Sequence, residues 1–417
     1  MSAAGEQFQT AVRGVEGVWP ATPSMWSYSS LSEAEECPRR WMLSRARYPT
    51  IWGREGYPPR PILAGLIGNA THRALEVILG TLQARGCVSA SDPSAVEALR
   101  DIGGFSRLLE DTVAAELETL QGNPRAADQL ASIRERLLRE VPAIRERLQA
   151  TVSRTRLQSP SDDEPITGTQ PSRGPLARGS HPEVKLRAEG LRLVGRADLI
   201  TLDDDGCAIT DYKTGAPSEH HADQLRLYAL LWSRDNEINP GGLPVRRLVV
   251  AYATHDETLD GPSAGELETL AGALSERIAK AESNLSRLPA PAYPAPEVCR
   301  NCSVRHLCDD YWMAARAAPA PEVSLQAAVF VDCEAVIATR NGPRSWLLSL
   351  AGHQGRALLR TPTEMPGFAA GDSVRLLGLA LSANEDSAEM ILTMTQFSEV
   401  FVLREQAQQP GILAALG

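Results

Sequence analysis

Two strand-like runs joined by a short acidic turn constrain this chain more than any other stretch. Residues 184–202 and 207–213 alternate apolar and polar side chains, and the four residues between them read Asp-Asp-Asp-Gly. Alternation with a period of two predicts β-strands, and an Asp-Gly pair between such runs predicts a tight turn. We therefore expect an antiparallel hairpin centred between Asp204 and Asp205.

This register would bring two carboxylates together. Asp198 and Asp211 are equally distant from the centre of the turn, so they should face each other across the two strands. The Cβ atoms of such partners lie about 5 Å apart, and two like charges there are destabilising unless something neutralises them. A divalent cation would do so, and two carboxylates with water suit the oxygen-preferring ions Mg²⁺ and Mn²⁺.

A lysine accompanies the two aspartates. Lys213 follows Asp211 by two residues, so strand alternation places both side chains on one face. A lysine beside a metal-bound water can orient the nucleophile and offset the charge on a pentavalent phosphate. The pattern indicates metal-assisted phosphodiester hydrolysis. The alternative is two surface aspartates ion-paired with Lys213 and Arg196, because so short a motif is common.

Three residues on predicted helices are further candidates for this site. His72 lies in the helical stretch GNATHRALE, where a ring nitrogen would supply another metal ligand. Gln224 and Tyr228 stand four residues apart and therefore share a helix face, from which they would contact a phosphate or the bases. For all three, an ordinary surface or packing role is the alternative.

A group of cysteines suggests a second metal centre. Cys299, Cys302 and Cys308 place three thiols within ten residues, and either Cys37 or His306 would supply a fourth ligand. Such a set would hold an iron–sulfur cluster or a structural zinc, and the spacing does not choose between them. The remaining cysteines are predicted to be buried apolar side chains, namely Cys87, Cys207 and Cys333.

The net charge and the hydropathy of the chain argue against two classes of protein, those that coat nucleic acid with a uniformly basic surface and those that span a membrane. A net charge of −10 argues against a uniformly basic, nucleic-acid-coating surface. A local arginine-rich stretch that includes Arg39 and Arg40 would still contact phosphates, although an arginine-rich surface without a partner explains it equally well. No run is long enough to span a membrane and no basic-then-apolar leader is visible, so we expect a cytoplasmic protein without membrane contact.

The periodicity divides the chain into two parts. Apolar residues at helical spacing predict helices at 63–85, 93–121, 125–154, 220–234 and 264–287. Residues 155–182 are rich in Pro, Gly, Ser and Thr and are predicted to be a flexible loop. After residue 320 only short strand-like runs remain, which predicts a small β-barrel over 321–417, next to a domain over 1–320. The chain contains no phosphate-binding loop of the G-x-x-x-x-G-K-[ST] type, so it is not a motor.

Taken in order, the motifs resemble those of one family. They are S-x-L-S-x-x-x-x-C-P, G-x-x-x-H-x-x-L-E, G-R-x-D-L-I, D-Y-K-T-G, Q-x-x-x-Y and C-x2-C-x5-C, spread over residues 25–315. This series resembles the RecB/AddB-like branch of the PD-(D/E)XK nucleases, which includes the CRISPR-associated RecB-like exonucleases. The resemblance implies an α/β, restriction-endonuclease-like core. The long helical insertion between His72 and Asp198 departs from the family pattern, and the strand-rich part after residue 320, which looks like an OB-type barrel, lies outside the resemblance.

The resemblance also implies residue roles. The metal ligands would be His72, Asp198, Asp211 and the carbonyl of Tyr212. Lys213 would be the catalytic lysine, and Gln224 with Tyr228 would lie on the nucleic-acid side. A [4Fe–4S] cluster would be held by Cys37, Cys299, Cys302 and Cys308.

The expected activity is Mg²⁺- or Mn²⁺-dependent hydrolysis of DNA, by an exonuclease or flap nuclease acting on single strands or free ends. It would serve DNA repair, recombination or phage defence, with a helicase or defence partner in trans. The alternatives are a non-catalytic DNA-binding or scaffold subunit of a helicase–nuclease complex, and a zinc-binding regulatory protein. The C-terminal barrel would grip single-stranded DNA or, alternatively, serve as a structural or protein-docking module.

Overall fold

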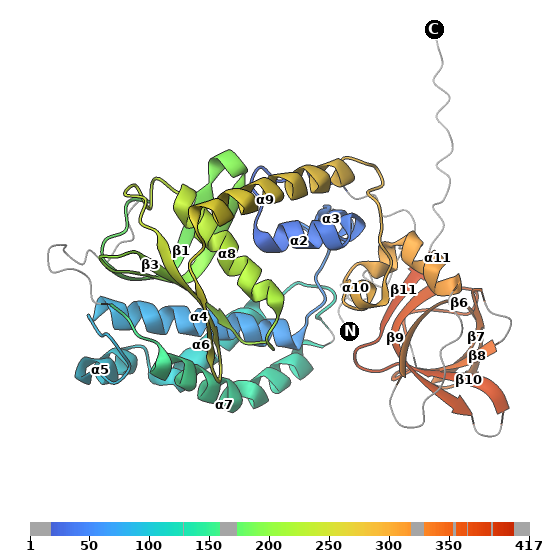
Figure 1. Ribbon diagram of the computed structural model, residues 1–417. Coiled ribbons are helices and arrows are strands. Elements are labelled where there is room, and N and C mark those ends of the chain that lie inside the picture. The colour runs from blue at the N-terminus through green and yellow to red at the C-terminus, as the bar shows by residue number, and fades with distance from the viewer. Residues whose placement is uncertain are drawn as a thin grey trace, which may run out of the picture.

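The computed structural model describes residues 18–127, 129–158, 173–317, 329–352, 356–364, 366–384 and 387–403. Figure 1 shows a sheet covered by helices on one side of the molecule and a smaller part built of strands on the other. Half of the predicted flexible loop over 155–182, residues 159–172, lies outside the described residues. The last four residues of that prediction are not loop, because a strand begins at Gly179.

The larger sheet has five strands in the order β1-β2-β3-β4-β5. Their bounds are Gly179–Ala188, Leu193–Leu202, Cys207–Lys213, Val245–Tyr252 and Asp256–Asp260. All neighbours are antiparallel except β3 and β4, which run parallel. The run predicted as one arm of the hairpin is in fact two strands, because the chain reverses through the 3-10 turn Glu189–Leu191 and Arg192 at φ 55°.

Helices cover both faces of this sheet (Figure 1). On one face α8 and α9 pack against the strands together with α2, at Glu219–Arg234, Ala264–Leu285 and Tyr28–Glu36. On the other face lie α4, α5 and α7, at Leu63–Ala84, Pro93–Asp101 and Leu130–Arg154. The helix predicted over 93–121 is broken, because Gly103 and Gly104 both have positive φ and α6 starts afresh at Gly104–Thr119.

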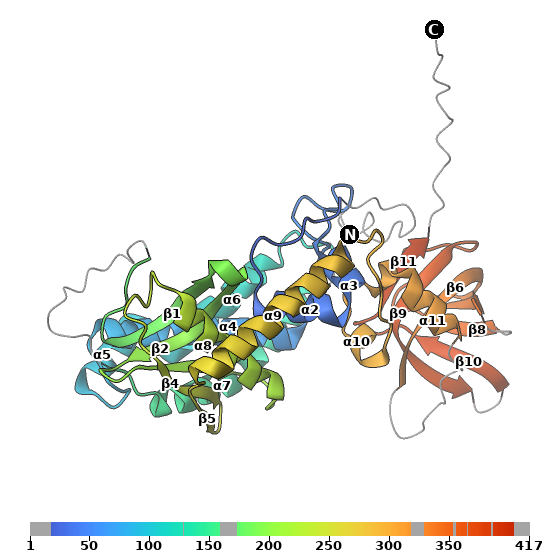
Figure 2. The same ribbon diagram turned by 45° about the horizontal axis from the view of Figure 1, so that its top comes forward.

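The segment that carries the predicted cysteine ligands is built from short helices. α3 (Pro38–Arg45) begins directly after Cys37, whose extended backbone separates it from α2. α10 (Pro296–Arg300), the 3-10 turn η2 (Arg305–Leu307) and α11 (Asp309–Ala317) carry the C-terminal end of this region. Figure 2 shows α3 and α10 close together, although more than 250 residues separate them in the chain.

The C-terminal sheet has six strands in the order β10-β8-β7-β6-β9-β11. Their bounds, from β6 to β11, are Val329–Gly342, Ser345–Leu350, Arg356–Arg360, Ser373–Asn384, Ser387–Thr393 and Glu399–Leu403. Strand β10 pairs with β9 as well as with β8, so the pairing returns on itself through five strands. These strands agree with the short strand-like runs that the sequence predicted for this part of the chain.

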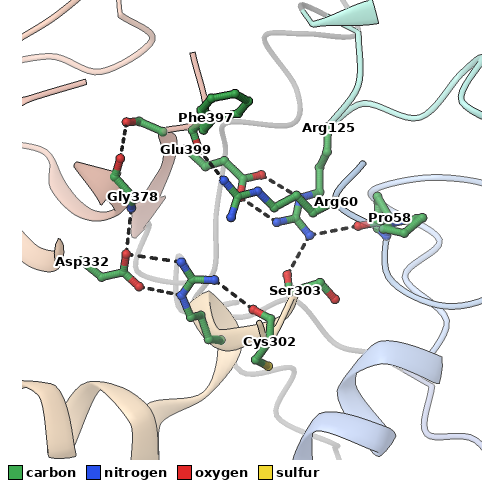
Figure 3. Close-up of polar contacts among 12 residues, drawn as sticks. Pro58, Arg60, Arg125, Cys302, Ser303, Asp332, Gly378, Phe397 and Glu399 are labelled. Atoms are coloured by element: carbon green, nitrogen blue, oxygen red, sulfur yellow. Dashed lines mark hydrogen bonds and ion pairs between the residues drawn. The ribbon is translucent and has the colours of Figure 1, made fainter. Parts of the chain in front are cut away.

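Arginines join the two parts of the molecule (Figure 3). The side chain of Arg125 has no exposed surface and donates from Nε and Nη2 to Glu399 on β11, both at 2.8 Å, and from Nη1 to the Ser303 carbonyl at 2.7 Å. Arg305 donates to Asp332 on β6 at 2.6 Å and to the Cys302 carbonyl at 3.1 Å. The C-terminal sheet is therefore held on the cysteine-bearing segment by buried ion pairs.

Three further contacts complete this junction. Arg375 on β9 donates to the His306 carbonyl at 2.6 Å and to Asp309 at 2.7 Å. The ring of His306 stacks on Phe401, with centroids 3.8 Å apart and an interplanar angle of 10°.

The helices of the described ranges were also compared with the length and hydropathy of a membrane span, and none of them reaches both.

Candidate functional site

The hairpin of β2 and β3 brings the two predicted carboxylates together. Its register pairs Leu199 with Thr210 and Leu202 with Cys207, so the next step along the ladder sets Asp198 opposite Asp211. This is the register that the sequence predicted. Asp211 is only 2% exposed, so the pair lies at a buried end of the hairpin and not on an open surface.

Each aspartate is held by a neighbour. The Tyr212 N–H donates to Asp198 Oδ2 at 2.7 Å. Burial, and then the charge of Asp211, raise the pKa of Asp198 well above its usual range. Asp211 Oδ2 lies 2.7 Å from Lys213 Nζ, but this ion pair is poorly aligned, and in the described part of the chain that oxygen accepts no hydrogen bond of normal geometry.

His72 reaches the pair from the opposite helix layer. Helix α4 places its Nδ1 3.8 Å from Asp198 Oδ2. Burial, with the nearby charge of Lys213, lowers the pKa of His72, so the ring is neutral near pH 7 and keeps a lone pair for a metal. His72 and Lys213 also line one small cavity between α4, α7 and the sheet.

A relay of polar groups links the lysine to α8. Lys213 Nζ donates to Gln224 Oε1 at 2.8 Å, and Gln224 Nε2 donates to the Tyr228 hydroxyl at 2.6 Å. The Tyr228 ring approaches β2 closely because Gly195 has no side chain; a Cβ there would lie 2.8 Å from Tyr228 Cε1. The structure thus gathers the predicted residues of β2, β3, α4 and α8 at one place.

The four predicted cluster cysteines line a single pocket. Cys37 comes from the break between α2 and α3, and Cys299, Cys302 and Cys308 come from the segment after α9. None of them is in a disulfide. His306, the other candidate for the fourth ligand, does not line this pocket, because its ring packs between Tyr57 and Phe401.

The predicted phosphate-binding arginines beside this pocket have partners within the protein. Arg39 donates to the Ala290 carbonyl at 2.6 Å and pairs with Asp310 at 3.2 Å. Arg40 pairs with Glu36 at 2.6 Å and with Glu33 at 3.7 Å. These contacts favour a role in fixing the cysteine segment.

Comparison with known proteins identifies the larger part of the chain. Residues 25–309 match the family model of the PD-(D/E)XK nuclease superfamily. The chain belongs to this superfamily. The match spans every candidate ligand and lysine described above, together with all four cysteines of the pocket.

Other comparisons add little to this family assignment. No curated protein matches the chain. The crystal structure of the p204 HINb domain is 20% identical to this chain. The match covers 21% of this chain and 49% of the p204 chain, with a TM-score of 0.17. A murine DNA-binding protein, in a structure bound with double-stranded DNA, is 9% identical. That match covers 54% of this chain and 95% of the murine chain, also with a TM-score of 0.17. Such scores do not bear on the fold or function of this protein.

Members of a nuclease superfamily of this kind need a divalent cation, and the residues present fit one. As the side chains stand, no three His, Cys, Asp or Glu residues of the described ranges are grouped tightly enough to ligate a metal. The donor set is nevertheless suitable: two carboxylates, a neutral imidazole and the nearby Tyr212 carbonyl. The poorly satisfied, buried Asp211 Oδ2 is the kind of atom that a cation would stabilise.

The thiol pocket fits a metal group for a similar reason. Burial raises the pKa of Cys299 and Cys308, and that of Cys302 to about 12, and the neighbouring Cys37 thiol adds to each shift. Buried thiols without a metal therefore stay protonated, whereas a bound metal stabilises the thiolate form.

One ionisable residue near the carboxylates was not predicted. Glu183 lies on β1, beside Asp198 in the sheet; its charge acts on Asp198, and the charge of Asp211 acts on Glu183. The sequence assigned residues up to 182 to a loop and residues from 184 to the hairpin, so it offered no means of placing Glu183 next to that pair.

Proposed function

We propose that this protein is a divalent-metal-dependent deoxyribonuclease whose active site contains Asp198, Asp211, Lys213 and His72. The observation that carries the proposal is the meeting of Asp198 and Asp211 across β2 and β3, with Lys213 Nζ 2.7 Å from Asp211. Membership of the PD-(D/E)XK superfamily supports the same chemistry.

Each residue of the candidate active site has a proposed role. His72, Asp198, Asp211 and the Tyr212 carbonyl would hold Mg²⁺ or Mn²⁺, which supplies Lewis-acid activation of water and of the phosphodiester. Lys213 orients the attacking water and offsets negative charge on the phosphate. Gln224 fixes the lysine by accepting its hydrogen bond, and Tyr228 fixes Gln224.

For the substrate, we propose single-stranded DNA or DNA with free ends, cleaved by exonuclease or flap nuclease action. The ordered series of RecB-like motifs supports this choice, as does the position of Gln224 and Tyr228 on the α8 side of the lysine. We further propose a role in DNA repair, recombination or phage defence, with a helicase or defence partner in trans.

The cysteine pocket is proposed to hold a [4Fe–4S] cluster, with zinc as the other metal that would suit it. Its support is the convergence of Cys37, Cys299, Cys302 and Cys308 on one pocket from distant parts of the chain. A brown, anaerobically purified protein that absorbs at about 400 nm would support the cluster, and a colourless, zinc-loaded one would contradict it.

The C-terminal part, from residue 321, is proposed to be a separate OB-like barrel that binds single-stranded DNA. The support is the closed pairing of five strands, in which β10 pairs with both β8 and β9. OB-type barrels use such a surface to bind single strands.

The deciding experiment is cleavage of end-labelled single-stranded, duplex and flap DNA with Mg²⁺ or Mn²⁺, with EDTA as the control. Lys213→Ala is expected to reduce the rate by roughly 10²–10³-fold, as the loss of one charge-stabilising group does, and Asp211→Ala to abolish it. Lys280→Ala, which removes an exposed lysine on α9, should leave the rate unchanged. DNA binding without cleavage by the wild-type protein would instead indicate a scaffold subunit.

A further inference from the structure

A third carboxylate stands in line with the two aspartates. On β1 and β2, Pro182 pairs with Leu199 and Val184 pairs with Ala197, which places Glu183 opposite Asp198. Asp198 is in turn opposite Asp211 on β3. Glu183, Asp198 and Asp211 therefore occupy one row that crosses three neighbouring strands. Residues directly opposite on neighbouring strands are close enough for their charges to act on one another.

The backbone at Glu183 is unusual for a strand. Its φ of 58° lies in the left-handed region, which favours glycine, yet a glutamate occupies the position. The side chain is only 15% exposed and contacts the guanidinium of Arg196. Arg196 also pairs with Glu76 on α4 at 3.0 Å, so the arginine fixes Glu183 between the strand and the helix. A strained residue that is held so firmly suggests a functional requirement.

The row of carboxylates lies among the other groups of the candidate active site. Asp198 Oδ2 lies 3.8 Å from His72 Nδ1, and Asp211 Oδ2 lies 2.7 Å from Lys213 Nζ. Tyr228 is the residue that holds Gln224, and through it Lys213. The three carboxylates therefore share one environment, in which Asp211 Oδ2 is buried and poorly satisfied.

We propose that Glu183 is a positioning residue of the cation site, which increases the affinity of Asp198 and Asp211 for the divalent ion. It adds a third negative charge to the row and offers an acceptor for the water molecules that a Mg²⁺ or Mn²⁺ ion keeps. This inference rests on the proposed function, because it concerns the same cation.

The test is titration of Mn²⁺ into DNA-free protein in metal-free buffer, followed by calorimetry. Glu183→Gln keeps the size of the side chain and is expected to weaken Mn²⁺ binding by about tenfold or more, as loss of an outer-shell partner does. The Mn²⁺ concentration that gives half-maximal cleavage should rise by the same factor. Glu76→Gln removes the same charge from the other partner of Arg196 and should change the affinity less than twofold.

Glu183→Gly separates binding from folding. Glycine suits the φ of this position, so the midpoint of thermal unfolding should be maintained or rise, while Mn²⁺ binding stays weak. Glu183→Asp, which keeps the charge, should recover part of the affinity. Wild-type affinity in Glu183→Gln, or equal losses in Glu183→Gln and Glu76→Gln, would overturn the inference.

The result also distinguishes this inference from the proposed function. If the wild-type protein binds no Mn²⁺, or if Asp211→Asn binds it as tightly as the wild type, the cation site itself is wrong. If Asp211→Asn loses binding while Glu183→Gln retains it, only the role of Glu183 is refuted.

Discussion

Asp198 is stabilised in its neutral form when no cation is present. Its side chain is 16% exposed, and both burial and the neighbouring carboxylates raise its pKa. A carboxyl group whose pKa is raised in the folded state binds a proton more tightly there than in the unfolded chain. The folded protein therefore loses stability as pH rises from the usual carboxyl range toward the raised pKa.

We therefore expect Asp198→Asn to stabilise the metal-free protein near neutral pH while it abolishes cation binding. The amide carries no charge at any pH, and its oxygen can still accept from the Tyr212 N–H. Thermal unfolding measured in EDTA at several pH values checks this: the wild-type midpoint should fall with rising pH, and the variant should fall less. Parallel curves for the two proteins would contradict the expectation.

The sequence predicts the positions of some individual residues of the candidate site but not of others. The spacing around a short turn is enough to place Asp198 opposite Asp211, because a tight turn fixes the register of its strands. Glu183 escapes prediction because its place depends on a second hairpin, in whose turn the positive-φ position is occupied by Arg192 and not by glycine. The Lys213–Gln224 contact depends on where α8 packs, which no local pattern specifies.

At the scale of the elements, α8 packs closely on the sheet at Gly195. Tyr228 and Leu231 fill the space above Gly195, where an added Cβ would lie 2.7 Å from Leu231 Cδ1. The glycine of the G-R-x-D motif is thus explained by packing: it lets the helix that carries Gln224 approach the strand that carries Asp198.

Gly195→Ala is expected to push α8 away from β2 and to lower the free energy of unfolding by about 1–3 kcal/mol, as overpacking does. Cleavage should fall as well, because Gln224 would move from Lys213. Gly190→Ala is the matched control, since a Cβ there meets nothing within 4 Å. Denaturant unfolding and the cleavage assay together measure both effects, and identical behaviour of the two variants would count against this account of the glycine.

The helices and strands differ in how well the sequence predicts them. The long helix α4 was predicted almost to its ends, since its apolar face repeats over 22 residues. The helix over 93–121 was predicted as unbroken, although its two adjacent glycines turn the chain. Strand β5, DETLD, was missed because it is short, acidic and largely exposed, and only its pairing with β4 makes it a strand.

At the scale of the whole molecule, the cysteine-bearing segment, residues 299–308, lies between the two sheets and is hydrogen-bonded to arginines that contact the C-terminal sheet or belong to it. The carbonyls of Cys302 and Ser303 each accept a hydrogen bond from an arginine that also pairs with a carboxylate (Figure 3). The His306 carbonyl does the same with Arg375, which pairs with Asp309. The sequence predicted two parts but not this junction, because Arg125 lies in the helical insertion, far along the chain from Glu399.

Arg125→Ala should lower the free energy of unfolding by about 3–5 kcal/mol, because it leaves buried groups without their partner. The carbonyls of Pro58 and Ser303 and the carboxylate of Glu399 all lose a hydrogen bond. Arg139→Ala, which breaks the exposed pair with Glu135, should cost no more than about 1 kcal/mol. Calorimetry compares the two, and similar small losses would show that the junction contributes little to stability.

The junction has a practical consequence for anyone who shortens this protein. A chain ending after α11 would keep Arg125 and Arg305 but lose Glu399 and Asp332, which lie on β11 and β6. The Trp312 side chain, now packed against Leu377 and Phe401 of the C-terminal sheet, would face water, so the truncated protein would be prone to aggregate even if its catalytic half is intact. Work on the isolated half would need a polar replacement at Trp312.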